Sequence, residues 1–230
     1  MRSVSTITNC RIFFLFLVVL LIKNSASAQE NSPYSRYGLG DVVPGQNIVN
    51  RAMGGASAAY YDPVTVNFIN PASYARLKYT TFDVGLDYTG RTLKASNPVR
   101  TLSSGYLIPS YVQVGFPLSK KNNWGMNIGL RPLTRINYEL QQTNRLPGID
   151  SVRTSFSGQG GSYQAYLGTG IGSKNFTVGL NAGYSFGSKN YVTERVFIND
   201  SVLYEKGKWG RSTFFRGFFV HGGAPYATPI

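Results

Sequence analysis

Cysteine and histidine are almost absent from this sequence of 230 residues. Cys10 is the single cysteine and His221 the single histidine. One cysteine excludes a disulfide framework and a thiolate metal site, and one histidine excludes a multi-histidine zinc centre. No serine lies in a G-x-S-x-G motif that would make His221 the base of a hydrolase. We therefore expect a protein that is not an enzyme and that holds no metal and no cofactor.

The N-terminus predicts export. A basic segment precedes 11 apolar residues, 12–22, and Ala26, Ser27 and Ala28 match the small-residue cleavage pattern. An uncleaved membrane anchor would need about 20 apolar residues. Cys10 precedes the apolar run, so it cannot be a lipid-modified mature N-terminus. We predict a signal peptide at 1–28.

Acidic residues are also scarce. Without residues 1–28 the chain has 20 basic and 10 acidic residues, a net charge of +10. In a cytoplasmic protein this excess would suggest a nucleic-acid partner. No basic cluster is longer than two residues, however, and an exported cationic protein fits an anionic membrane surface. We expect outer-membrane lipid and glycolipid as partners and no nucleic acid.

Long apolar runs are missing after residue 28, and strict alternation takes their place. Phe82, Val84, Leu86 and Tyr88, for example, alternate with Asp83, Gly85, Asp87 and Thr89. Successive side chains of a strand point to opposite faces, so each such segment has one apolar face and one polar face. The further alternating segments are 108–118, 124–138, 163–171 and 176–186.

A soluble antiparallel sheet with one wet face would also alternate. These strands, however, are about 10 to 15 residues long, against about 5 to 6 in soluble proteins. Aromatic residues bound the apolar runs, as in membrane girdles: Trp124, Tyr138, Phe176 and Phe186. We predict an all-β fold, an antiparallel transmembrane β-barrel with about six or seven strands at 79–230, in the outer membrane of a Gram-negative-type bacterium.

Pro109 and Pro132 interrupt two of the predicted strands. Proline cannot donate to the hydrogen-bond ladder, and a closed barrel has no edge at which to place it. We therefore predict a strand kink, a bulge or a local gap at these two positions.

Arg131 and Arg135 are predicted to share the polar face of segment 124–138 with Asn127 and Asn137. A guanidinium in a barrel lumen can bind a carboxylate ligand through two hydrogen bonds. It can equally pair with the lumen's own carboxylates, Asp83 and Asp87. The sequence leaves both interpretations open.

Residues 29–78 do not alternate and contain "GGASAAYYDPVTVNFINPAS". Small residues allow close packing, and the step Asn70, Pro71, Ala72 would break a strand. Non-helical backbone is tolerated at membrane depth only inside protein or along a water-filled cavity. We predict that this segment is a hatch that plugs the barrel.

The same residues resemble the N-terminal hatch of the FadL-type transporters, which carry long-chain fatty acids and other hydrophobic compounds across the outer membrane. Asn70, Pro71 and Ala72 match the triplet before the family's first strand. The resemblance implies a hatch that shifts on ligand binding, and hydrophobic small molecules that leave sideways at a strand kink. The family's barrels have more strands than the six or seven seen here, which implies an N-terminal fragment.

Transport is not the only function that this pattern fits. Related barrels act as shuttles or anchors in protein secretion. The alternative function is therefore an outer-membrane barrel with a secreted-protein partner.

Overall fold

The computed structural model describes residues 31–96, 99–145, 151–173, 175–198 and 205–226. The predicted signal peptide and Cys10 lie outside these ranges. The chain divides into two compact units. In the smaller unit, residues 90–106 form the end of a hairpin, where the hydroxyls of Thr92 and Ser103 are 3.2 Å apart. The larger unit contains residues 30–89 and 107–230.

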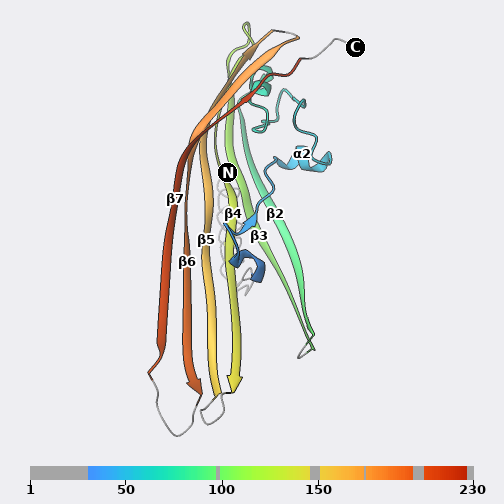
Figure 1. The fold of residues 1–230 in the computed structure, drawn as a ribbon. Helices are drawn as coiled ribbons and strands as arrows, with labels where there is room; N and C mark the ends of the chain where they lie inside the picture. The colour runs from blue at the N-terminus through green and yellow to red at the C-terminus, as the bar shows by residue number, and fades with distance from the viewer. Residues whose placement is uncertain (1–30, 97–98, 146–150, 174, 199–204, 227–230) are drawn as a thin grey trace, which may run out of the picture. The chain divides into compact units, whose positions relative to one another are not determined.

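The main element is an antiparallel sheet (Figure 1). Six long strands follow one another in chain order, and the two-residue strand β1 pairs separately with β4. The sequence-based prediction of an all-β antiparallel fold with six or seven strands is confirmed. Within the described residues the order runs from β2 to β7 without closing into a barrel. The strands are β1 (Asp41–Val42), β2 (Thr81–Ser96), β3 (Val99–Ser119), β4 (Trp124–Arg145), β5 (Ser151–Gly172), β6 (Thr177–Ile198) and β7 (Gly207–Gly223).

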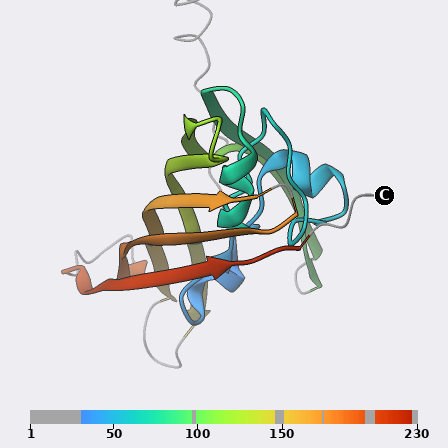
Figure 2. The same ribbon diagram turned by 90° about the horizontal axis from the view of Figure 1, so that it is seen from above.

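Residues 31–78 form an irregular segment on one face of the sheet, which we call the inner face (Figure 2). The segment contains two 3-10 helices, η1 (Pro33–Arg36) and η2 (Pro71–Arg76), and one short α-helix, α2 (Ile48–Ala52). None of the described helices is long and apolar enough to cross a membrane. Helix η2 packs on β4, β5, β6 and β7, and η1 lies along β4.

The long strands exceed the 10 to 15 residues expected from the sequence. β4, β5 and β6 each have 22 residues. They are long because pairing continues past the point at which the apolar alternation stops. Residues 191–198, whose alternation is loose, are still paired with β5, and residues 191–195 also pair with β7.

The register between β4 and β5 shifts between Pro132 and Thr134. Arg131 donates to the Gln164 side chain, and the hydroxyls of Thr134 and Ser162 are 2.8 Å apart. Gln164 and Ser162 share a face of β5, so Arg131 and Thr134 share a face of β4 although they are three residues apart. The extra residue, Leu133, therefore exchanges the two faces of the rest of β4.

This bulge corrects one expectation. The alternation placed Ile136 and Tyr138 on the same apolar face as Trp124. Instead they lie on the inner face, with 2% and 3% of their surfaces exposed. Arg135 and Asn137 take the other face, so Arg131 and Arg135 do not share one.

The bulge also separates two halves of the sheet. In the near half, at the β3–β4 and β5–β6 turns, the outer face is apolar and exposed. Its large side chains include Trp124, Ile128, Leu130, Tyr163, Leu167, Ile171, Val178, Leu180 and Phe186. In the far half, from Thr134 and back to Ser162 in β5, the polarity reverses.

Phe156 marks the inner face of the far half, because Arg36 of η1 lies 4.8 Å from its ring centroid. Since side chains alternate along β5, its outer face there carries Arg153, Ser155, Ser157 and Gln159. Tyr138 and Tyr191 lie on the inner face, with ring centroids 6.0 Å apart.

Candidate functional site

A row of four glycines crosses the inner face of the near half. Gly125, Gly170, Gly179 and Gly223 are paired in register across β4, β5, β6 and β7. A Cβ atom added at Gly170 would lie 2.5 Å from the carbonyl oxygen of Pro71, and one at Gly179 or Gly223 would overlap Pro71 or Asn70. The row is therefore a seat without side chains, into which the Asn-Pro-Ala step fits.

Asn70 caps helix η2 in this seat. Its side-chain oxygen accepts from the Ala72 amide at 3.2 Å, and its side-chain nitrogen donates to the Ala58 carbonyl at 2.7 Å. Pro71 occupies the first helical position, where its missing N–H is not needed. Ala72 is fully buried. The triplet predicted as a hatch motif thus forms one capped turn against the glycine row.

Tyr74 anchors the same helix one row further along the strands. Its hydroxyl donates to the Asn181 side chain at 3.1 Å and accepts from Asn127 at 3.3 Å. The Asn181 side chain also donates to the Phe68 carbonyl at 3.0 Å. Burial raises the pKa of Tyr74 to about 12, although the amide of Asn127 that donates to its oxygen acts in the opposite direction. Polar residues of the strands thereby pair with the irregular segment instead of with water.

The loop before η2 is held by amide side chains. Asn67 donates to the carbonyls of Ser57 and Tyr60, at 2.6 and 3.0 Å. Asn47 and Gln113 both donate to the Val66 carbonyl, at 2.8 and 3.1 Å. These contacts satisfy backbone groups that would otherwise be buried without partners, which makes irregular structure tolerable here.

Arg131 also holds the irregular segment. Its guanidinium donates to the Gln164 side chain at 3.1 and 2.9 Å and to the Gly45 carbonyl at 2.9 Å. The same group lies 4.9 Å from the centroid of the Phe68 ring. Arg131 therefore joins β4 and β5 to two parts of the segment, and its predicted contact with a ligand stays a prediction.

Arg135 contacts neither Arg131 nor the sheet carboxylates through a hydrogen bond. It donates to the carbonyl of Pro109 in β3 at 2.7 Å. On the inner face, Arg51 of α2 forms an ion pair with Asp87 at 2.5 Å, and Ser110 also donates to Asp87. Asp83 accepts from Gln113 and Tyr111. Among the described residues, Asp87 forms its salt bridge with Arg51, and neither Arg131 nor Arg135 forms one with Asp83 or Asp87.

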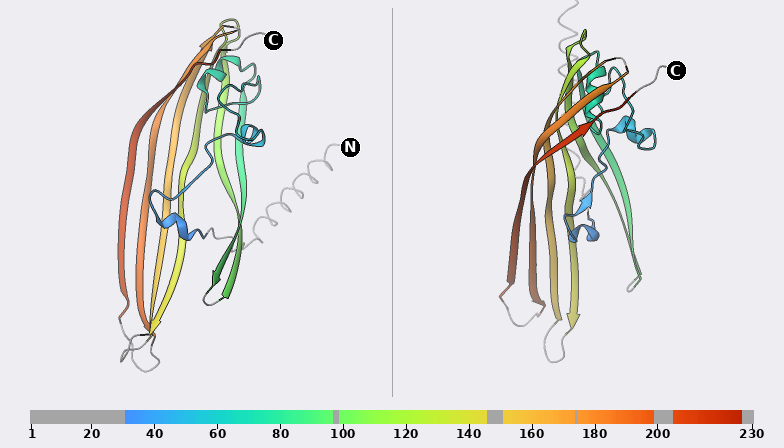
Figure 3. Two further views of the ribbon diagram at one scale, coloured as in Figure 1. Left: turned by 45° about the vertical axis from the view of Figure 1, so that its right-hand side comes forward. Right: turned by 45° about the horizontal axis from the view of Figure 1, so that its top comes forward.

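The two predicted kink positions are close to a change in the partner of β4. The described register of β3 with β4 begins at Val112 and Leu130. Past the bulge, Thr134 and Arg135 pair with Val42 and Asp41 of β1 instead. The N-terminal segment thereby lies along the edge of β4 (Figure 3).

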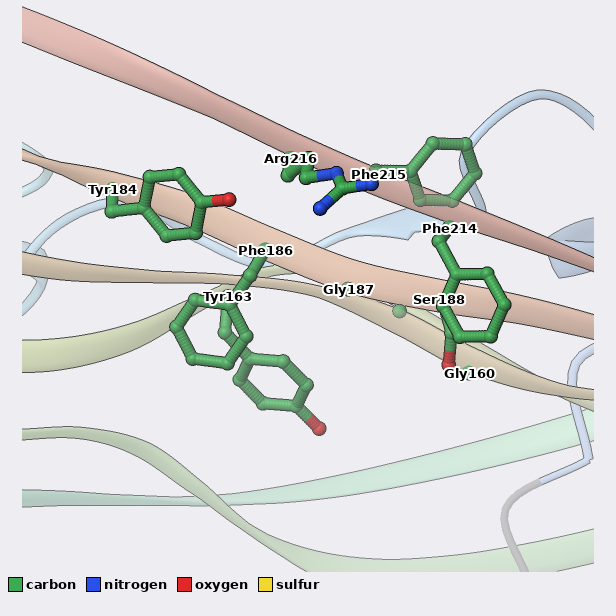
Figure 4. A pocket seen from close by; sticks show the side chains of 10 residues that line it. Gly160, Tyr163, Tyr184, Phe186, Gly187, Ser188, Phe214, Phe215 and Arg216 are labelled. Carbon is green, nitrogen blue, oxygen red and sulfur yellow. The ribbon is translucent and has the colours of Figure 1, made fainter.

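The outer face carries a hollow where its apolar residues end. Tyr163, Tyr184, Phe186 and Phe214 surround it, beside Gly160, Gly161 and Gly187 (Figure 4). The rings of Tyr163 and Phe186 stack with centroids 6.0 Å apart. Arg216, opposite Phe186 in the register, adds a positive charge at the rim.

No group of three potential metal ligands occurs among the described residues. Two buried side chains do stand out, because parts of their amides have no hydrogen-bond partner in the described part of the chain. They are Asn50, through both side-chain atoms, and Asn127, through its oxygen. With this chemistry the described residues of the inner face can hold polar backbone.

The sequence pointed to two of these features only partly. Glycines 168, 170 and 172 recur every second residue of the sequence, and Gly168 and Gly170 pack on η2. The sequence does not show that the row continues through Gly125 and Gly223, because this depends on the pairing between strands. The pairing of β1 with β4 had no signal in the alternation, because β1 has only two residues.

A family model named BamG matches residues 10–230, which is nearly the whole chain. The chain belongs to the BamG family. No curated protein and no solved structure matches it.

Membership of the BamG family overturns the assignment to the FadL-type transporters, and with it the transport of long-chain fatty acids. The resemblance lay in about 25 residues around the Asn-Pro-Ala step. In the structure that step is a capped turn on glycines, and any sheet covered by an irregular segment could use such a turn. The motif therefore reports a packing solution and not a cargo.

Proposed function

We propose that this BamG-family chain is a membrane-embedded component in the assembly of outer-membrane proteins. The family match carries the proposal, because it covers residues 10–230 and indicates an outer-membrane-associated location in Gram-negative bacteria. The function is therefore closer to the alternative drawn from the sequence, a barrel that serves proteins, than to solute transport.

The near half of the sheet supports insertion in the membrane. Its outer face runs from Trp124 to Pro132 in β4 and from Tyr163 to Ile171 in β5, nine residues each. About 9 to 11 tilted residues of a strand cross the hydrocarbon core. Aromatic side chains stand at both ends of this stretch, as they do at the membrane interfaces of barrels. We infer that these strands belong to a transmembrane barrel.

The far half then extends beyond the membrane. Its polar outer face, with Arg153, Ser155 and Gln159, suits water and would be costly in lipid. Arg216 and the aromatic hollow lie at the boundary between the two halves, the level at which lipid and glycolipid head groups would meet the protein. These lipids remain the expected membrane partners.

The filled inner face supports a role in scaffolding. Helix η2, Tyr74 and Arg131 tie the irregular segment to the strands of the near half. None of these contacts requires a catalytic site or a binding site for a small hydrophobic cargo. We propose a non-enzymatic protein whose partners are other outer-membrane proteins.

Depletion of the protein in its native bacterium tests this function. We expect folded outer-membrane proteins to decrease in isolated membranes, while uptake of radiolabelled long-chain fatty acid per folded transporter stays unchanged. The tagged protein should also co-purify with other outer-membrane proteins in fixed stoichiometry. Unchanged levels of folded outer-membrane proteins after complete depletion would overturn the proposal.

A further inference from the structure

Beyond the bulge, a part of the irregular segment occupies the edge of β4. Over residues 133–139 the neighbour on this edge is the chain segment 31–43, which we call the edge segment (Figures 1 and 3). The backbone contributes two of its hydrogen bonds. The Val43 amide donates to the Leu133 carbonyl and the Ser32 amide donates to the Asn137 carbonyl, both at 2.9 Å.

The two residues of β1 also pair with β4 through the backbone, and side chains replace the backbone toward the N-terminal end of the segment. The Asn31 side chain donates to the Glu139 carbonyl at 3.0 Å and accepts from the Glu139 amide at 3.1 Å. The Asn137 amide donates to the Ser35 hydroxyl at 3.2 Å. The edge segment thus satisfies the groups that a strand would satisfy, but it forms only two residues of strand itself.

The edge segment also has little apolar anchorage. Tyr34 and Val42 are 74% and 81% exposed, and Tyr37 and Leu39 are exposed as well. Its other contacts reach β5 and β6: Lys189 donates to the Gly38 carbonyl at 2.6 Å, Tyr191 donates to the Arg36 carbonyl at 2.7 Å, and the Arg36 guanidinium lies 4.8 Å from the centroid of the Phe156 ring. Replacing this segment would sacrifice hydrogen bonds that another strand could restore, and little buried apolar surface.

The two faces of β4 here define which strand would fit. Ile136 and Tyr138 line the inner face, and Arg135, Asn137 and Glu139 line the outer face. A strand added to this edge would match them by alternating apolar and polar residues. Such alternation is the pattern of a membrane-spanning β-strand.

We propose that the β4 edge at 133–139 binds an alternating, amphipathic β-strand of another polypeptide, and that the edge segment holds this site until the strand displaces it. Addition of a strand to a sheet edge takes its affinity from backbone hydrogen bonds and its specificity from alternate side chains. This inference deepens the proposed function, because such strands are what an unfolded outer-membrane protein presents.

A reversible lock on the edge segment gives the sharpest experiment. Val42 and Thr134 face each other in the register. Since the hydrogen bond from Val43 to Leu133 places them at a non-hydrogen-bonded position, their Cα atoms should be about 4.5 Å apart, within reach of a disulfide. Val42→Cys with Thr134→Cys, in a Cys10→Ser background, is locked by oxidation and released by reduction.

The probe is a fluorescent peptide with the alternating sequence FTVGLNAGYSF, flanked by lysines, and its control is the same composition scrambled to remove the alternation. Binding to the purified full chain in detergent is followed by anisotropy. We expect the reduced protein to bind the alternating peptide at least about tenfold more tightly than the oxidised protein does. Equal binding by the two forms, or equal binding of the two peptides, would overturn the proposal.

Weakening the contacts of the edge segment should increase the affinity for the peptide, whereas a substitution that damages the fold should lower it. Asn31→Ala removes two of its hydrogen bonds to Glu139, so the free edge is populated more often and the apparent affinity rises, by about threefold or more. Tyr34→Ala, at an exposed position, should leave the affinity unchanged. Weaker binding by Asn31→Ala would contradict displacement.

This assay needs no assembly activity, so it separates the two proposals. If the chain binds the peptide but depletion leaves the levels of outer-membrane proteins normal, the strand-binding site is supported and the proposed function is overturned. If depletion reduces assembly but the chain does not bind the peptide, the proposed function is supported and the strand-binding site is overturned.

Discussion

The irregular segment is fixed to the two halves of the sheet by different means. In the near half, η2 enters a row of glycines, where backbone lies directly on backbone and buried amides pair with the segment. In the far half, the edge segment lies along one strand, with exposed apolar side chains and hydrogen bonds that come partly from side chains. Close packing cannot yield without strain, whereas edge pairing can be exchanged for another strand. One continuous segment therefore combines a closely packed region at η2 with the edge segment, which we propose to be displaceable.

The largest expected effect comes from filling the seat. Gly179→Val places side-chain atoms where the backbone of Pro71 and Ala72 now lies. We expect a loss of about 3 kcal/mol or more in the stability of the docked segment, since backbone on both sides resists movement. The measurement is the urea concentration at which a protease begins to cut within residues 31–78.

Gly217→Val is the matched control, because an added Cβ there meets no atom within 4 Å. Its protease resistance should be within about 0.5 kcal/mol of the unmodified protein. If both variants lost the docked segment equally, the seat would not depend on close packing.

Tyr74→Phe should have the next largest effect, about 2 kcal/mol at neutral pH, because Asn181 and Asn127 lose their partner. The effect depends on pH in a defined direction. The pKa of Tyr74 is raised to about 12 in the folded protein, so the stability it contributes is complete below pH 10 and is lost as pH rises through 12.

Alkaline titration of the docked segment, followed by proteolysis, measures this dependence. The unmodified protein should release residues 31–78 over that pH interval. In Tyr74→Phe, the part of this pH-dependent release that comes from the Tyr74 hydroxyl should be absent. Identical titration curves for the two proteins would show that the hydroxyl does not cause the release.

Removing the helix cap should have an intermediate effect. Asn70→Ala loses both the bond from Ala72 and the bond to Ala58, and we expect a cost of about 1 to 2 kcal/mol. Asn70→Ser keeps a capping oxygen and should recover about half of that cost. The same proteolysis assay ranks the three proteins, and a serine variant as unstable as the alanine variant would show that capping contributes little.

The smallest effect is expected in the edge segment. Tyr37→Ala changes an exposed side chain, so the stability of the docked segment should change by less than about 0.5 kcal/mol. A cost comparable to that of Asn70→Ala would erase the difference between the two regions. Hydrogen exchange should likewise be faster at the amides of Ser32 and Val43 than at those of Ala72 and Ser73.

Much of the sheet could be predicted from local patterns. Alternation along residues 81–89 and 163–171 depends only on the period of a strand, so it identified the strands and the apolar outer face of the near half. The irregular character of residues 29–78 was also visible, because Pro71 and the small residues before it break any regular pattern. The family was not, since the Asn-Pro-Ala step reflects packing that unrelated plugged sheets can share.

The candidate site was less accessible. Arg135 was placed beside Arg131 because a two-residue period cannot register the extra residue, Leu133, which exchanges the faces beyond it. The salt-bridge partner of Asp87 was also out of reach of the alternation, because Arg51 lies 36 positions away in a segment without alternation.

The sequence by itself determined that strands dominate this protein, which residues of its near half face outward, and that an irregular segment precedes them. These properties follow from the chemistry of neighbouring residues and need no knowledge of the partner strand. Only the tertiary structure decided that glycines of four strands align into one seat, that Ile136 and Tyr138 turn inward, and that residues 31–43 occupy the edge of β4. Each of these depends on register and on contacts between distant residues, and the single added residue at the bulge is enough to turn Ile136 and Tyr138 to the other face.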